Sequence, residues 1–307
     1  MPHHDQGDQD GSPSPDGPAG RVLHRLLVEQ RAELDRREDG IRGGVPDSVH
    51  KARVATRRLR SALGVYRPLV DRDVTDRIRR ELRWLARTLG DARDLEVVHE
   101  RLRGLLDEEP PSLVVGPVAA RIDATYAGRQ QEADAHVQRA LDSPRHQELL
   151  AALDDLVTAP PWIDAAETPA REVLLPRVRR EWKALDRCVR AIPGAADQDR
   201  AVHDARKAAK SLRYVVEALV PAWGADAERL AGAAKEISSL LGERQDTVVA
   251  RRDLAALARE ASAAGESAFT YGRLHAREEA DAARLDRDFE GLWATSSRKR
   301  LRAWLRS

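Results

Sequence analysis

From Arg21 onward, apolar residues recur at spacings of three and four positions, which is the period of amphipathic helices. Leu, Val and Ala fill most of these positions, and the strict alternation typical of strands is rare. Proline and glycine gather at a few points that we interpret as joints between helices, namely residues 43–46, 110–111, 160–161 and 192–194. The pattern therefore predicts an all-α protein.

Two segments lack this helical pattern. Residues 1–20 consist largely of Pro, Gly, Asp and Ser and offer almost nothing to bury, so we expect a disordered N-terminal tail. The Pro-rich stretch TAPPWIDAAETPA begins at Thr158, and we interpret residues 158–169 as a linker. These segments separate two predicted helical regions, residues 21–157 and residues 170–307.

Several helical segments occur twice along the chain. VHKARVATRRLR, which starts at Val49, matches VHDARKAAKSLR, which starts at Val202, at an offset of 153. LGDARDLEVV, from Leu89, matches LGERQDTVVA, from Leu241, at an offset of 152. Weaker matches precede and follow them, so four helical segments recur in the same order. We predict an internal duplication, in which two similar four-helix bundles are related by a pseudo-two-fold axis and form one domain.

The charge of the chain is almost balanced. Its 307 residues include 52 Lys or Arg and 51 Asp or Glu, so any site for an anion must be local. Only six of the 52 cations are lysine, and the guanidinium of arginine is well shaped for bidentate contact with phosphate. One cysteine, Cys188, excludes a disulfide framework. With no long apolar run either, we expect a cytoplasmic protein without a membrane span.

The first repeated segment concentrates positive charge on one side of a helix. At 100° per residue, its four basic side chains share an arc of about 80° beside the apolar stripe. In the second copy, four basic side chains occupy the same places. We expect no acidic side chain one helical turn away to neutralise either face, so the stacked cations repel unless an anion is present. We therefore predict an anion site with the two faces on opposite walls of one cleft or pore, formed by His50, Arg53, Arg57, Arg60, His203, Arg206, Lys210 and Arg213.

Further candidates lie one helix later in each copy. Arg83 and Lys235 are 152 positions apart, and we add both to the predicted site. Arg93 corresponds to Gln245, so a contact made by this arginine is not duplicated. We interpret the repeated carboxylates of Asp94 and Asp246 as groups that orient neighbouring arginines, or that cap a bend at the preceding glycines, and not as catalysts.

The repeated motif resembles that of a known family. The segments His-x-x-Arg-x-x-x-Arg/Lys-x-Leu-Arg at 50–60 and 203–213, each followed by Leu-Gly-x-x-x-Asp, are similar to those of CHAD domains, named for a conserved histidine and an α-helical fold. The resemblance covers nearly all of residues 21–306. It implies two four-helix bundles around a basic cleft or central pore that binds inorganic polyphosphate, and it assigns the eight repeated basic residues to anion contacts.

Some members of that family follow a triphosphate-tunnel domain with an ExExK signature. This chain has no such signature, so the resemblance does not imply hydrolysis. We expect a non-enzymatic protein without a cofactor, whose partner is inorganic polyphosphate, either free or in polyphosphate granules. A linear polyanion suits many moderate arginine contacts along a track. Because the two histidines titrate near neutrality, we also expect tighter binding at about pH 6 than at about pH 8.

Two other functions remain open at this point. An exposed mid-helix histidine beside basic residues is also typical of histidine phosphotransfer domains, although that function leaves the duplicated basic stripe unexplained. A nucleic acid is a less favoured partner, because a narrow track lined by cations suits a thinner chain without bases. The E-x-x-H pattern at 96–99 corresponds to Val-Val-Ala-Arg at 248–251, so the second copy lacks it and we predict no metal site.

Overall fold

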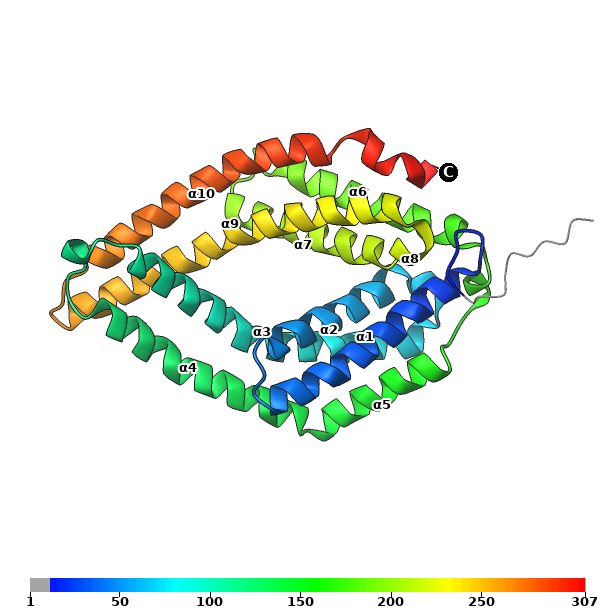
Figure 1. Cartoon of the computed structure of the whole chain (residues 1–307), viewed down its shortest axis with the longest axis horizontal. Helices are drawn as coiled ribbons and strands as arrows, with labels where there is room; N and C mark the ends of the chain where they lie inside the picture. The colour runs from blue at the N-terminus through cyan, green and yellow to red at the C-terminus, as the bar shows by residue number, and fades with distance from the viewer. Residues whose placement is uncertain (1–11, 307) are drawn as a thin grey trace, which may run out of the picture.

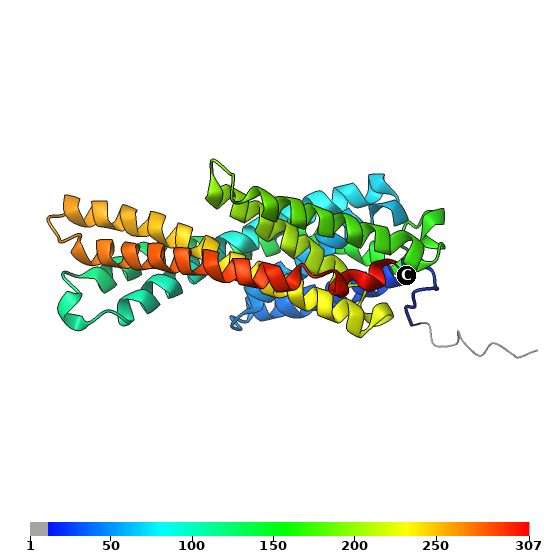
Figure 2. The same cartoon turned by 90° about the horizontal axis from the view of Figure 1, so that it is seen from above.

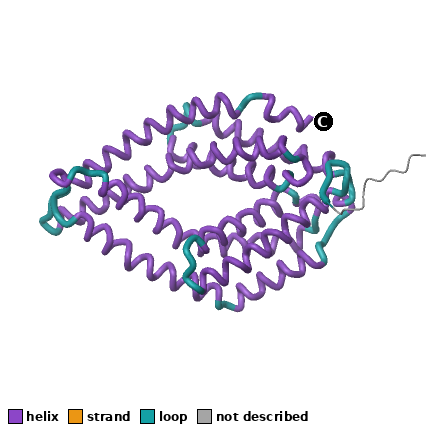
Figure 3. The backbone as a smooth tube through the Cα atoms, in the orientation of Figure 1, coloured by secondary structure: helices purple, strands orange, loops and turns teal. Residues whose placement is uncertain are grey.

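The computed structural model describes residues 12–306. Its α-helices are α1 (Ala19–Arg42), α2 (Ser48–Val65), α3 (Arg72–Asp107), α4 (Val118–Leu141), α5 (Pro144–Thr158), α6 (Ala170–Ala191), α7 (Gln198–Glu217), α8 (Val220–Trp223), α9 (Ala225–Ala263) and α10 (Phe269–Ser296). Short 3-10 helices occupy Arg67–Leu69, Pro111–Leu113, Asp164–Ala166 and Lys299–Arg306. Between residues 12 and 306 there is no strand, which confirms the predicted all-α class (Figure 3).

The long helices pack chiefly against their neighbours in the sequence. The series α1, α2, α3 and α4 has the same order of contacts as the series α6, α7, α9 and α10 (Figure 1). The two series meet where α2 packs on α7 and where α3 packs on α9. At one end of the elongated molecule, the hairpins of α3 with α4 and of α9 with α10 project together beyond the other helices (Figure 2). The internal duplication itself stays a prediction.

Two hydrophobic cores hold the fold together, and both include residues from each predicted region. The larger one contains the buried Leu59 on α2 and Leu212 on α7. The smaller one lies in the projecting hairpins and includes Leu102 and Leu254. Burying each such leucine contributes about 1.5–3 kcal/mol to folding. Since neither core is confined to one region, burial of apolar area ties residues 21–157 to residues 170–307.

The apolar stripe of the repeated segments decides how α2 and α7 are oriented. On α2 the buried positions include Ala52 and Leu63, and on α7 they include Ala205 and Val216. Because these residues recur at helical spacing, each helix turns one face into the larger core. The basic residues that border this face stay partly accessible to solvent.

The predicted tail and linker lie against one another. Residues 1–11 of the tail fall outside the described part of the chain. The amide of Ala170 donates to the carbonyl of Gly17 at 2.8 Å, and the amide of Ala19 donates to Thr168 at 2.9 Å. The linker also contacts the start of α3, where the amide of Asp71 donates to Pro161 at 2.8 Å. Both segments therefore have backbone partners, and α1 already begins at Ala19.

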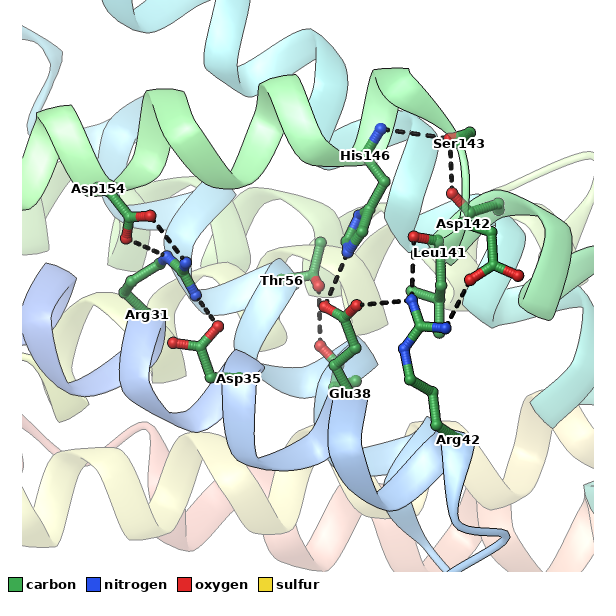
Figure 4. Close-up of polar contacts among 12 residues, drawn as sticks. Arg31, Asp35, Glu38, Arg42, Thr56, Leu141, Asp142, Ser143, His146 and Asp154 are labelled. Carbon is green, nitrogen blue, oxygen red and sulfur yellow. Dashed lines mark hydrogen bonds and ion pairs between the residues drawn. The ribbon is translucent and has the colours of Figure 1, made fainter.

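Polar contacts fix α5 along α1 (Figure 4). The guanidinium Nε of Arg31 donates to Asp154 at 2.8 Å, and a ring nitrogen of the buried His146 lies 2.8 Å from Glu38. The first region thus contains one helix more than the four we predicted. In the second region, the segment that corresponds to α5 forms the 3-10 helix at Lys299–Arg306.

Candidate functional site

The structure brings six of the ten predicted site residues together at the contact between α2 and α7. The two helices are joined beside this point by the buried Tyr66, whose hydroxyl donates to the carbonyl of Val215 at 2.9 Å. The charge of Lys210 is close enough to those of Arg57 and Arg53 for repulsion to lower the pKa of Lys210. The charge of Lys210 in turn lowers the pKa of His50. We call this group the central cluster, and its members are His50, Arg53, Arg57, His203, Arg206 and Lys210.

The central cluster strongly disfavours positive charge when no anion is bound. Burial and, after it, the charges of the neighbouring Arg206 and Arg57 together lower the pKa of Lys210 to about 7. Burial also lowers the pKa of Arg57 to about 10, with Arg53 as the next cause. Between residues 12 and 306, no carboxylate forms an ion pair with either Arg57 or Lys210. A bound anion would relieve this repulsion.

The two histidines are neutral near pH 7 in the free protein. Partial desolvation lowers the pKa of His50, and the charges of Arg93 and Arg53 lower it as well. For His203, desolvation is again the largest cause of a lowered pKa, followed by Lys207. Since ordinary histidine titrates at about 6.5, a lowered pKa leaves both rings mainly neutral at about pH 7. Lys210, whose pKa is lowered to about 7, also titrates near neutrality, and the sequence prediction did not include this titration.

The repeated glycines let two arginines approach α3 and α9. Both helices continue without interruption through Gly90 and Gly242, so neither aspartate caps a helix end there. A Cβ at Gly90 would lie 3.5 Å from Nε of Arg53, and a Cβ at Gly242 would lie 3.2 Å from Nη2 of Arg206. A helix interior normally disfavours glycine, and close packing of a guanidinium explains its presence.

The two repeated aspartates have different environments. Asp94 receives an Nη1 hydrogen bond from Arg53 at 2.7 Å, and so orients this arginine. Desolvation raises the pKa of Asp246, although the charges of Arg206 and Arg101 act to lower it. The carboxylate of Asp246 is therefore less ready than an ordinary aspartate to carry a full negative charge.

Replacing the two glycines tests the close-approach explanation. Alanine is favoured over glycine in a helix interior by about 1 kcal/mol. Gly90→Ala meets an ordinary contact distance, so we expect its free energy of unfolding to increase by up to about 1 kcal/mol. Gly242→Ala must displace Arg206, so we expect a smaller gain and an anion affinity about threefold lower, because the arginine moves out of line. Urea denaturation and anion titration measure both effects. Equal stabilisation and unchanged affinity in both variants would contradict the explanation.

The four remaining predicted residues lie in two different places. Arg60 and Arg83 line a cavity of about 1120 Å³ between α2, α3, α6 and α7, which we call the arginine cavity. Lys235 lines a cavity of about 400 Å³ between α1, α2, α7 and α9, which we call the opposite cavity. Arg213 donates from Nε to Glu217 at 2.6 Å, so the expectation that no acid lies one turn away is wrong for this residue. Its neutralised guanidinium is not equivalent to that of Arg60.

The arginine cavity contains basic residues that the sequence prediction missed. Its walls carry ten basic and only two acidic side chains, Asp76 and Glu181. Asp76 pairs with Arg67 and Arg79, so most of the other cations keep no carboxylate partner. In the sequence, only the helical spacing of arginines on α3 and on α6 indicates this cavity. These arginines are not repeated in the other half of the chain, so a comparison of the two halves does not reveal them. Besides Arg60 and Arg83, the basic residues are Arg67, Arg72, Arg79, Arg80, Arg87, Arg177, Arg180 and Lys207.

The unduplicated Arg93 and the E-x-x-H pattern have ordinary partners. Nη1 of Arg93 donates to Glu96 at 2.8 Å, while its charge still acts on His50. A ring nitrogen of His99 lies 2.8 Å from a carboxylate oxygen of Asp123. Over residues 12–306, the structure contains no group of three or more His, Cys, Asp or Glu side chains suited to a metal ion. Nor does any helix in this range have the length and apolar character that crossing a membrane requires.

Sequence relatives extend over most of this chain. The uncharacterized proteins MT2285 and Rv2226, from two strains of Mycobacterium tuberculosis, are each 37% identical to it over 273 residues, which is 88% of this chain. The same match covers 52% of each relative, so the chain spans about half the length of the curated relatives it matches.

Solved structures show the same fold. PptA from Streptomyces chartreusis superposes with a TM-score of 0.74 at 22% identity, covering 90% of this chain and 99% of that one. The CHAD domain from the plant Ricinus communis superposes with a TM-score of 0.72 at 24% identity, covering 92% and 94%. The sequence model of the CHAD domain matches residues 25–255. This chain therefore belongs to the CHAD domain family.

Proposed function

We propose that this protein binds inorganic polyphosphate, without transforming it, at the central cluster between α2 and α7. The observation that carries the proposal is the pair Arg57 and Lys210, which come from different helices, both have a lowered pKa and have no ion-pairing carboxylate between residues 12 and 306. The charge of Arg57 is one cause of the lowered pKa of Lys210. Such an arrangement costs folding free energy in the free protein. A linear polyanion that lies along both helices would remove that cost and accept charge-assisted hydrogen bonds.

The neighbouring side chains favour phosphate oxygens as the bound groups. The Nε groups of Arg53 and Arg206 and Nδ1 of His203 are buried without a hydrogen-bond partner. Arginine presents its donors in a planar fork that matches two oxygens of one phosphate. This chain belongs to the CHAD family, and its resemblance to that family implies polyphosphate binding, which supports the same ligand. We place the protein in the cytoplasm and on polyphosphate granules as part of this proposal.

Single-stranded nucleic acid is the competing ligand, because it offers phosphates at a similar charge density. Binding of that kind uses aromatic side chains on which bases stack. Here Trp182 stacks on Trp293 at 5.6 Å between ring centroids, and Trp223 contacts Trp304 at 6.0 Å. The four rings thus pack in two pairs, each ring against another tryptophan. The arrangement favours polyphosphate over nucleic acid.

A competition between two polyanions tests the proposed function. We expect polyphosphate to bind at least about tenfold more tightly than single-stranded DNA of equal charge, because the bases add bulk without stacking partners. The affinity should fall steeply with salt, with a log–log slope of about 0.7–0.9 for each phosphate contact. Isothermal titration at two salt concentrations measures both quantities. Equal affinities, or shortening of the polyphosphate chains during incubation with Mg²⁺, would contradict the proposal.

A further inference from the structure

The two cavities beside the central cluster differ in charge although they occupy corresponding places. The arginine cavity lies between the helix pair α2 and α3 and the helix pair α6 and α7. The opposite cavity lies between the pair α7 and α9 and the pair α1 and α2. In the repeat alignment, Arg83 corresponds to Lys235 and Arg60 corresponds to Arg213. The two cavities therefore lie at equivalent positions of the two repeats, and Arg60, on the wall of the arginine cavity, is close enough to Arg57 of the central cluster to affect its pKa.

The arginine cavity holds cations that have no partner inside the protein. The side chains of Arg80, Arg83, Arg87 and Arg180 are exposed there. Between residues 12 and 306, none of these four forms an ion pair with a carboxylate. The side chain of Arg60 is partly buried. Its charge acts on Arg57 of the central cluster, and the charges of Arg83 and Arg87 in the cavity act on it in turn. Positive charge thus continues from α2 into the cavity.

The walls of the opposite cavity lack this excess of positive charge. Where α6 carries Arg180, α1 carries Glu29, and where α3 carries Arg80, α9 carries Gly232. Glu217 neutralises two cations at once, because Arg58 donates to it at 2.8 Å and Arg213 at 2.6 Å. With Glu29, Glu217 and Glu228 on its walls, this cavity contains more acidic than basic side chains. It is also the smaller of the two.

We propose that polyphosphate held at the central cluster continues into the arginine cavity and does not enter the opposite cavity. This inference rests on the proposed function and adds a direction to it. A bound chain lies off-centre, with its extra phosphates on the side of α3 and α6. Long chains then gain affinity from one cavity only, while a short oligophosphate occupies the central cluster alone.

The test compares long-chain polyphosphate with tripolyphosphate as ligands of the whole chain. The variant Arg80→Gln/Arg87→Gln/Arg180→Gln removes three exposed, unpaired guanidinium groups, so we expect native circular dichroism and unchanged thermal stability. Its affinity for long chains should fall about 30-fold or more, with a salt slope lower by about 1–2, while tripolyphosphate affinity changes less than about threefold. Removing carboxylates from the other side, in Glu29→Gln/Glu228→Gln, should raise long-chain affinity.

The matched control is Arg77→Gln/Arg190→Gln/Arg252→Gln, which removes the same charge from side chains that are 74%, 77% and 73% exposed and lie outside both cavities. A triple variant of the arginine cavity that binds long chains as this control does would overturn the inference. An equal loss for tripolyphosphate would also overturn it, because the arginines would then act by general attraction. A wild type that binds no polyphosphate would instead refute the proposed function itself.

Discussion

Replacing Arg57 and Lys210 together by methionine is expected to weaken polyphosphate binding by about 100-fold, because each lost charge-assisted hydrogen bond costs about 1.5 kcal/mol and 1.4 kcal/mol is a factor of ten. Methionine keeps the aliphatic stem and removes the charge. The two side chains come from different helices, and the charge of Arg57 helps to lower the pKa of Lys210. Isothermal titration of the wild type and the variant with long-chain polyphosphate measures the loss.

The stability of the same variant separates a binding defect from misfolding. Two repelling cations without carboxylate partners are lost, so the free energy of unfolding should increase by about 1 kcal/mol or more in the absence of anion. The matched control is Arg190→Met/Arg252→Met, which removes two exposed surface charges. If the Arg57 and Lys210 variant bound polyphosphate as tightly as this control, the central cluster would not be the binding site.

The second large effect is that of pH on affinity. Because the pKa of Lys210 is lowered to about 7 in the free protein, this side chain is mainly neutral at about pH 8 and mainly charged at about pH 6. A polyanion binds the charged form, so binding above the free pKa requires uptake of a proton. Affinity is therefore expected to fall about tenfold between about pH 6 and about pH 8 at constant ionic strength.

The variant Lys210→Arg should remove most of this pH dependence, because a guanidinium stays charged throughout the range. Titrations at three pH values measure the slope for wild type and variant. Lys183→Arg is the matched control, since Lys183 is exposed on α6 and lies outside the central cluster and both cavities around it. If Lys210→Arg kept the slope of the wild type, the histidines would be the titrating groups, and the lowered pKa values of His50 and His203 argue against this outcome.

Prediction from the sequence succeeded where a feature depends on neighbours along the chain. The spacing of Leu, Val and Ala predicted helices throughout, since a helix repeats every 3.6 residues whatever packs against it. The same geometry placed His50, Arg53 and Arg57 on one side of α2, and the structure brings all three into the central cluster. The motif residues also indicated the CHAD family, which the match over residues 25–255 confirms.

Prediction failed where a feature depends on which neighbour a helix meets. Arg60 and Arg213 occupy the same place in the repeat, yet one lies beside exposed arginines and the other is bound by Glu217. The glycine before each repeated aspartate suggested a point for the aspartate to cap, whereas the helix does not end there and the glycine makes room for a guanidinium. In both cases the missing information was the distance between side chains on different helices.

The sequence by itself determined the helices, the family and the two basic faces, because periodicity and local spacing act within a single segment. Only the tertiary structure decided that Arg180 of α6 and Arg80 of α3 line one cavity. It also decided that Glu217 neutralises Arg213, the residue that corresponds to Arg60. It also decided the lowered pKa of Lys210. Desolvation and Coulomb energy depend on burial and on distances between groups that are remote in the chain, and packing alone sets both quantities.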